Sequence, residues 1–158
     1  MEINILFDEG FEDSIEESWL KSIIEQVIIA EEVTADAELS LVVVGQDRIQ
    51  QLNKTYLDRD GPTDVISFPM FSEQSEGETG IFITPPDGIQ HLGEVVISYP
   101  QAVIQAEEHH HSVKKEITIL VIHGILHLLG YDHDVPGLVK DMRARETEII
   151  KVISDKLE

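Results

Sequence analysis

The sequence contains no cysteine in its 158 residues. Disulfide bonds and thiolate metal ligands are therefore excluded, and any transition metal must be bound through nitrogen and oxygen atoms of His, Asp and Glu. The chain does not need such cross-links, because a domain of this length buries about 70% of its unfolded surface. We expect a single domain that spans residues 1–158.

Basic residues are scarce, with 11 Lys and Arg against 31 Asp and Glu and a formal net charge of −20. Sequence-independent binding to nucleic acid depends on neutralisation of phosphates by Lys and Arg, so this balance argues against a large basic binding surface. Most of the acidic residues are expected to form a solvated surface.

Long apolar runs are also missing. The longest candidate, from Ile117 to Gly130, falls short of the ~18 to 20 residues of a membrane span and is interrupted by Thr118, His123 and His127. The N-terminus has no basic segment followed by an apolar stretch, so no secretory signal is predicted. We expect a soluble cytoplasmic protein that does not bind membranes.

Hydropathy patterns predict strands that alternate with helices along the chain. Asp13, with Glu16 three residues later, is predicted to cap the first helix, and Asp47 the second, which would direct Ile49, Leu52 and Tyr56 inward. Pro100 is expected to begin the third helix and Ser112 to cap the fourth. The predicted strands are 3–7, 39–44, 65–68 and 93–98, and the predicted helices are 13–30, 47–57, 100–110, 113–129 and 138–153.

This alternation predicts an α+β or α/β domain, and we favour α+β, with one mixed sheet of about four strands. The helix from Val113 to Leu129 is apolar nearly all round in its second half, so it is expected to be the central buried helix. The segment Ser72 to Gly88 is rich in Ser, Glu, Gly and Pro and is predicted to be a mobile loop.

Two histidines in a buried helix indicate a metal site. His123 and His127 are four residues apart, which places both imidazoles on one helix face. Gly130 then ends the helix, so that the chain can turn back and bring His133 close to His123 and His127. Three imidazoles leave a fourth tetrahedral position for water, which is typical of a catalytic zinc site.

The spacing H-x-x-x-H-x-x-G-x-x-H matches that of metzincin proteases. In those enzymes the residue after the first histidine is a Glu that acts as the general base, whereas here it is Gly124. The pattern therefore predicts a metal-dependent hydrolase but not a metzincin mechanism.

The run from His123 to His133 closely resembles the signature of the YbeY family of bacterial metal-dependent endoribonucleases. Two further blocks, 52–56 with 62–69 and 92–98, resemble the family's other motifs in the same order, so that the resemblance covers nearly the whole chain. It implies a single-strand-specific endoribonuclease with one zinc ion on His123, His127 and His133. It also implies a cytoplasmic role in 16S rRNA 3′-end maturation and ribosome quality control. The implied partners are single-stranded ribosomal RNA and the ribosome or ribosome-associated proteins, with no DNA specificity.

The chain departs from the family at Leu57, where other members usually carry an Arg that is thought to engage RNA. Arg59 is our candidate replacement, both for catalysis and, with Lys54, for substrate binding, because phosphoryl chemistry needs positive charge. Asp132 is a candidate for orienting a metal-binding imidazole, although it can equally bond its own turn.

Three other polar groups are less informative. Asp64 and Glu94 are expected at strand ends, where turn capping is as good an interpretation as a site role, and Tyr131 is expected to be a packing residue.

The run His109 to His111 is expected to face solvent, because consecutive residues of a helix point about 100° apart and cannot converge on one ion.

Two alternatives to RNA cleavage stay open. One is hydrolysis of another bond, such as a peptide or amide, which the metzincin-like spacing suggests. The other is a non-catalytic, metal-stabilised module that binds the ribosome or a GTPase, which the shortage of basic residues favours.

Overall fold

The structure is a computed structural model that describes residues 2–33, 36–57, 63–69, 89–129 and 144–153. The predicted loop at 72–88 lies outside these residues. The described elements are listed here in chain order: β1 (Glu2–Phe7), α1 (Glu17–Ala30), β2 (Asp36–Val44), α2 (Gln46–Leu57), β3 (Val65–Pro69), β4 (Ile89–Ser98), α4 (Tyr99–Glu108), α5 (Val113–Leu128) and a last helix, 144–153.

The four strands form one mixed sheet in the order β1-β2-β4-β3. The pairs β1·β2 and β2·β4 are parallel, and β3 runs antiparallel to β4 at the edge. The register of β2 and β4 shifts by one residue, so that Glu38 pairs with His91 and Leu39 with Gly93. Gly93 adopts a φ of +132° at this bulge, a conformation that favours glycine.

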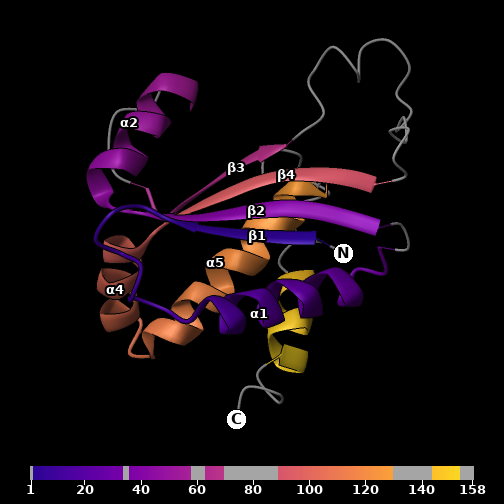
Figure 1. The fold of residues 1–158 in the computed structure, drawn as a ribbon. Helices are drawn as coiled ribbons and strands as arrows, with labels where there is room; N and C mark the ends of the chain where they lie inside the picture. The colour runs from indigo at the N-terminus through magenta and orange to yellow at the C-terminus, as the bar shows by residue number, and fades with distance from the viewer. Residues whose placement is uncertain (1, 34–35, 58–62, 70–88, 130–143, 154–158) are drawn as a thin grey trace.

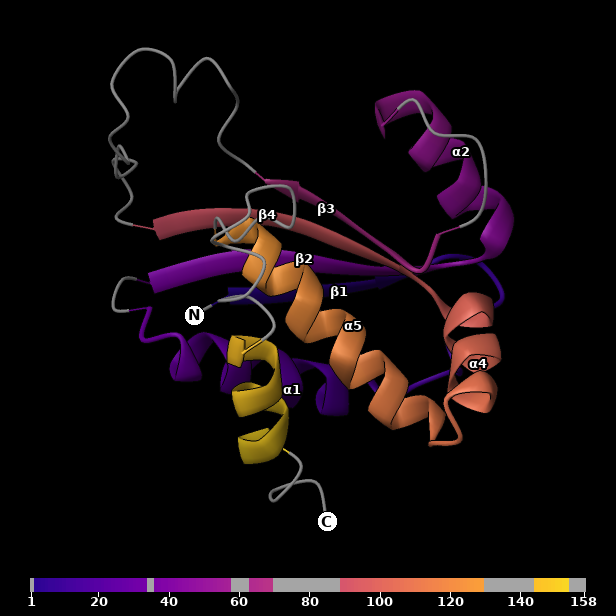
Figure 2. The same cartoon turned by 180° about the vertical axis from the view of Figure 1, so that it is seen from behind.

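Helices cover the two faces of the sheet unequally. Figures 1 and 2 show α1, α5 and the helix 144–153 on one side and α2 on the other side. Alternate residues of β4 divide accordingly, with Val95 and Ile97 in the larger hydrophobic core and Val96 in the smaller cluster beneath α2. The two central strands are apolar on both faces because both faces are covered.

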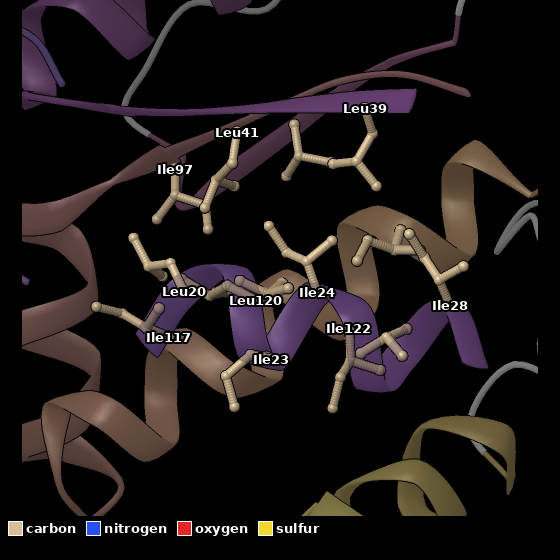
Figure 3. Packing of buried hydrophobic residues seen from close by; sticks show 14 of the residues in the cluster. Leu20, Ile23, Ile24, Ile28, Leu39, Leu41, Ile97, Ile117, Leu120 and Ile122 are labelled. Atoms are coloured by element: carbon tan, nitrogen blue, oxygen red, sulfur yellow. The ribbon is translucent and has the colours of Figure 1, made fainter. Parts of the chain in front are cut away.

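The larger core lies between the sheet and the helix pair α1 and α5. Figure 3 shows Leu39, Leu41 and Ile97 of the sheet above aliphatic side chains of the two helices. From α5 come Ile117, Leu120 and Ile122, all nearly or fully buried. The α+β fold class, the four-stranded mixed sheet and the central buried helix are thus confirmed. Among the described residues, no helix has the length and hydropathy to cross a membrane.

Several predicted helix boundaries were wrong. Helix α1 begins at Glu17 rather than after Asp13, because the preceding residues form turns in which Ser14 donates to the Phe11 carbonyl through both its N–H and its hydroxyl. Helix α2 begins at Gln46, so that Asp47 lies inside its first turn. Helix α4 begins at Tyr99, one residue before Pro100.

Other expectations had mixed outcomes. Ser112 caps α5 as predicted, with its hydroxyl accepting a hydrogen bond from the Lys115 N–H. Ile49 is buried as predicted, but Tyr56 is 65% exposed and contacts Phe68 edge-to-face instead of entering the core. Glu94 lies within β4 rather than at its end, because this strand begins at Ile89.

Candidate metal centres

Helix α5 carries the first two predicted metal ligands. His123 and His127 are each half-buried, and their ring centroids are 4.8 Å apart at an interplanar angle of 68°. The helix therefore brings the two imidazoles onto one face, as the spacing predicts. His133, like Gly130, Tyr131 and Asp132, lies outside the described residues, so that the third ligand stays a prediction.

A carboxylate from the end of the chain holds the first of these imidazoles. The Nδ1–H of His123 donates to the Glu146 Oε1 over 2.8 Å, and Glu146 is largely buried, with a side chain 19% exposed. Metal-binding histidines usually donate one ring N–H to a carboxylate while the other nitrogen coordinates. This bond therefore fixes the ring orientation and would direct Nε2 of His123 to a metal.

Arg145 ties the helix that carries Glu146 to α1. Its guanidinium donates to the Ala30 carbonyl, to Glu31 Oε2 over 3.2 Å and to Glu148 Oε2 over 3.0 Å. Burial lowers the pKa of Arg145, but the charges and hydrogen bonds of Glu31 and Glu148 outweigh it and the net pKa is raised. The guanidinium consequently stays charged, and the helix 144–153 is fixed beside α5.

Gly124 lies at the closest approach of α5 to the sheet. A Cβ at this position would be 2.6 Å from Val95 Cγ1, and the Gly124 carbonyl accepts a hydrogen bond from the Ser67 hydroxyl over 2.9 Å. The residue after the first histidine therefore faces β3 and β4, not the side on which the imidazoles lie. A Glu general base of the metzincin kind has no room here.

A second group of metal-ligand type lies where α4 meets α5. Glu116 is only 2% exposed, and its Oε1 accepts hydrogen bonds from His111 Nε2 over 2.6 Å and from His109 Nδ1 over 3.0 Å. Ligand atoms of His109, His111 and Glu116 all lie within 4.8 Å of one another. Burial raises the pKa of Glu116, but hydrogen bonds from the two imidazoles and from Gln105 outweigh it, and the net pKa is lowered.

The run from His109 to His111 was expected to face solvent without converging. The first part holds for His109 and His110, which are exposed, but not for His111, and the second part was wrong for His109 and His111. Helix α4 ends at Glu108, and His110 has a φ of +57°, so that the run is not helical. His109 is 55% exposed and His111 17% exposed, and both reach Glu116. Only His110 is exposed with no recorded contact to this cluster.

Asp64 adjoins this cluster through an amide. Gln105 Nε2 donates to Glu116 Oε2 over 2.9 Å and to Asp64 Oδ2 over 3.2 Å, while Asp64 Oδ1 accepts from the Val65 N–H over 2.8 Å. Asp64 therefore does cap the start of β3, and it also connects β3 to the α4–α5 junction. Sequence patterns did not predict the site contacts of Gln105, Glu116 or Glu146, because these contacts join residues from separate elements.

Of the predicted RNA-contacting residues, the structure describes Lys54, which does not lie on the helix that carries His123 and His127. Lys54 is exposed in the last turn of α2, on the other side of the sheet from α5 (Figure 1). Arg59 lies outside the described residues. The roles of Lys54, Arg59 and Asp132 stay predictions.

Comparison with known proteins gives a consistent result over almost the whole chain. The family model described as endoribonuclease YbeY matches residues 7–154. A curated endoribonuclease YbeY from Dehalococcoides mccartyi strain CBDB1 is 43% identical over 100% of this chain and 96% of its own length. One from Moorella thermoacetica is 41% identical over 84% of this chain and 83% of its own length.

A solved structure supports the same relationship at the level of the fold. The solution structure of TM1509 from Thermotoga maritima superposes with a TM-score of 0.63 at 26% identity. The match covers 98% of this chain and 91% of the other. The fold, with one mixed sheet packed against a buried helix, is therefore shared with an experimentally determined structure.

Proposed function

Because the chain belongs to the YbeY endoribonuclease family, we propose that it is a metal-dependent endoribonuclease that cuts single-stranded RNA. The observation that carries the proposal is the pair His123 and His127 on one face of α5, with His123 oriented by Glu146. Metal-binding histidines usually have a carboxylate partner of this kind, which supports the proposal.

We propose zinc on His123, His127 and His133. The described residues fit this ion, because imidazole nitrogens are zinc ligands and two of them already share a helix face. When bound, zinc with an open position would lower the pKa of water towards ~7 and polarise a phosphate oxygen. Glu146 would hold His123 in place during this chemistry, and Asp132 is proposed to do the same for a neighbouring imidazole.

Positive charge for the phosphate is proposed to come from Arg59, with Lys54 as a second contact. The net charge of −20 argues that intrinsic binding to RNA is weak and rests on few ionic contacts. Delivery to RNA is then proposed to rely on the ribosome or a ribosome-associated protein. In this proposal the protein acts in the cytoplasm, in 16S rRNA 3′-end maturation and ribosome quality control.

One alternative now has less support. A metzincin-type protease needs a carboxylate directly after the first histidine, and Gly124 fills the contact between α5 and Val95 so completely that a side chain does not fit. A non-catalytic binding module differs from the nuclease in one measurable way. A binding module would still bind its partner after the metal is removed, provided that the fold is kept. A metal-dependent nuclease would stop cleaving RNA.

The test is cleavage of an end-labelled single-stranded fragment of ribosomal RNA by the purified protein. The wild type is expected to cut, to stop after chelation and to resume after zinc is added back, while His127→Ala does not cut under any of these conditions. His110→Asn serves as the control, because this exposed imidazole lies away from His127. A folded, zinc-loaded wild type that leaves RNA intact would overturn the proposal.

A further inference from the structure

The turn between α4 and α5 is built so that two histidines point to one carboxylate. The His111 N–H donates to the Ala106 carbonyl and the His110 N–H to the Glu107 carbonyl, which is the Schellman pattern of a helix end. His110 occupies the left-handed position of this motif. The backbone is therefore fixed on both sides of His110, and the side chains of His109 and His111 lie together, with ring centroids 5.4 Å apart.

The donor set that results suits a zinc-class ion. Two imidazole nitrogens and one carboxylate oxygen are a known zinc-binding combination, and they leave a fourth position for water. Tetrahedral zinc ligands are roughly 3.3 Å apart, from bond lengths of about 2.0–2.1 Å. The two His–Glu116 distances of 2.6 and 3.0 Å need only a small opening to reach this value.

The surroundings of the cluster also favour a cation. Gln105 holds the second oxygen of Glu116 and bridges it to the carboxylate of Asp64, so that the ligand carboxylate is oriented from behind. Glu107 and Glu108 are exposed in the same helix end, while Lys114, two residues before Glu116, lies over the Trp19 ring at 5.3 Å from its centroid. The exposed side of His109 gives an ion access from solvent.

From this geometry we infer that His109, His111 and Glu116 bind a divalent transition-metal ion of the zinc class, separate from the site proposed on His123 and His127. Glu116 and His123 are seven residues apart on α5, or about 10 Å along the helix axis. Ions that act together in two-metal hydrolysis are only about 3.5–4 Å apart. The second ion would therefore not act together with the first in a two-metal step. It would fasten the α4–α5 turn to the helix that carries His123 and His127.

The experiment is a zinc titration of chelator-treated full-length protein, with metal content and thermal unfolding measured on the same samples. The wild type is expected to bind two ions per chain, and His109→Ala and His127→Ala one each. His109 is the ligand to replace because its half-exposed ring can be removed without opening the core. In His127→Ala, zinc should still raise the Tm, and adding His109→Ala should abolish that shift.

His110→Asn is the matched control. It removes the imidazole in the middle of the run, and Asn tolerates the left-handed conformation. It should bind two ions with unchanged affinity. If it loses zinc as His109→Ala does, the run binds zinc only as an exposed histidine cluster and the inference is overturned.

Two further outcomes separate this inference from the proposed function. Unchanged stoichiometry and affinity in His109→Ala would overturn the second site while leaving the catalytic one intact. One ion per chain that is retained in His127→Ala and lost in His109→Ala would support the second site and contradict the site proposed for catalysis. As an independent readout, long-range ¹H–¹⁵N spectra of the His127→Ala protein should show zinc-induced shifts at His109 Nδ1 and His111 Nε2.

Discussion

The Nδ1 atom of His123 lies 2.8 Å from Oε1 of Glu146, although 23 residues separate the two in the chain. A carboxylate in this position sets the ring orientation and raises the basicity of the opposite nitrogen. Arg145, the neighbour of Glu146, holds the helix in place through Glu31 and the Ala30 carbonyl. The end of the chain is therefore connected to the proposed catalytic centre.

Replacing this carboxylate should weaken metal binding. Glu146→Ala is expected to reduce zinc affinity at the catalytic site by about 10- to 100-fold, and cleavage with it, because His123 loses its orienting partner. Competition with a chromophoric chelator, in the His109→Ala background to isolate one site, would measure this. The control is Lys151→Ala, an exposed position on the same helix. Equal zinc affinity in Glu146→Ala and in the control would contradict the role of Glu146.

Adding one methyl group at position 124 should destabilise the fold. In Gly124→Ala the new Cβ would clash with Val95, at a cost of about 1–3 kcal/mol that exceeds the gain of about 1 kcal/mol in helix propensity. Urea unfolding should therefore show a lower free energy of unfolding. The double variant with Val95→Ala removes the clashing atoms, so the Gly124→Ala penalty should shrink in that background. A Gly124→Ala protein more stable than wild type would show that α5 can move away from the sheet.

The left-handed residue in the α4–α5 turn predicts a stabilising substitution. His110→Gly should raise the free energy of unfolding by about 0.5–1 kcal/mol, because glycine adopts a positive φ without the Cβ strain of histidine. The measurement is urea denaturation in the presence of a chelator. Glu108→Gly, inside the last turn of α4, should have the opposite effect. Loss of stability in His110→Gly would mean that the His110 side chain makes a favourable contact.

Glu116 should give the metal-free protein an acid-sensitive stability. Its folded-state pKa is lowered below the ordinary value of 4.5, so the stabilisation is complete above that value and is lost as the pH falls through the folded-state pKa. The groups that face it are His109 and His111 from the turn, Gln105 from α4 and, through Gln105, Asp64. The stability difference between wild type and Glu116→Gln should therefore shrink below about pH 4.5. A difference that stays constant from pH 7 to pH 3 would contradict this.

Binding to RNA should be weak and sensitive to salt. With few cations available, affinity should fall steeply as ionic strength rises, with a slope in log–log form of about −0.7 per phosphate contact on single strands. Fluorescence anisotropy with the catalytically inactive His127→Ala protein would measure the slope. Arg59→Ala and Lys54→Ala should each reduce the slope by about one contact. Tight binding that barely responds to salt would contradict the inference that binding to RNA is weak and rests on few ionic contacts.

Local patterns were sufficient to predict the elements and the layers. Hydropathy patterns predicted all four strands, and the nearly all-apolar second half of α5 predicted that it is the central buried helix. The start of α1 was wrong because a capping box at Asp13 competes with a turn that Phe11 anchors against the core. The strand order could not be predicted, because hydropathy and strand propensity do not indicate which strands are neighbours in the sheet.

The site was predictable only where its members share one helix. The i, i+4 spacing predicted that His123 and His127 would lie together, and they do. Glu146 and the pairing of His109 and His111 with Glu116 depend on how separate elements meet, which no local pattern records. The prediction that the histidine run cannot converge was wrong because it assumes a helical run, whereas α4 ends at Glu108.

Helix α5, the central helix of the fold, is synthesised after α1 and all four strands. During synthesis from the N-terminus, α1 and the four strands leave the ribosome before α5, yet α5 contributes Ile117, Leu120 and Ile122 to the core that they share. Parallel pairing of β2 with β4, about 50 residues apart in the chain, also closes late. A nascent chain that ends before Val113 therefore exposes the part of the sheet that α5 contacts, on β3 and β4. Such chains are candidates for chaperone binding until α5 emerges.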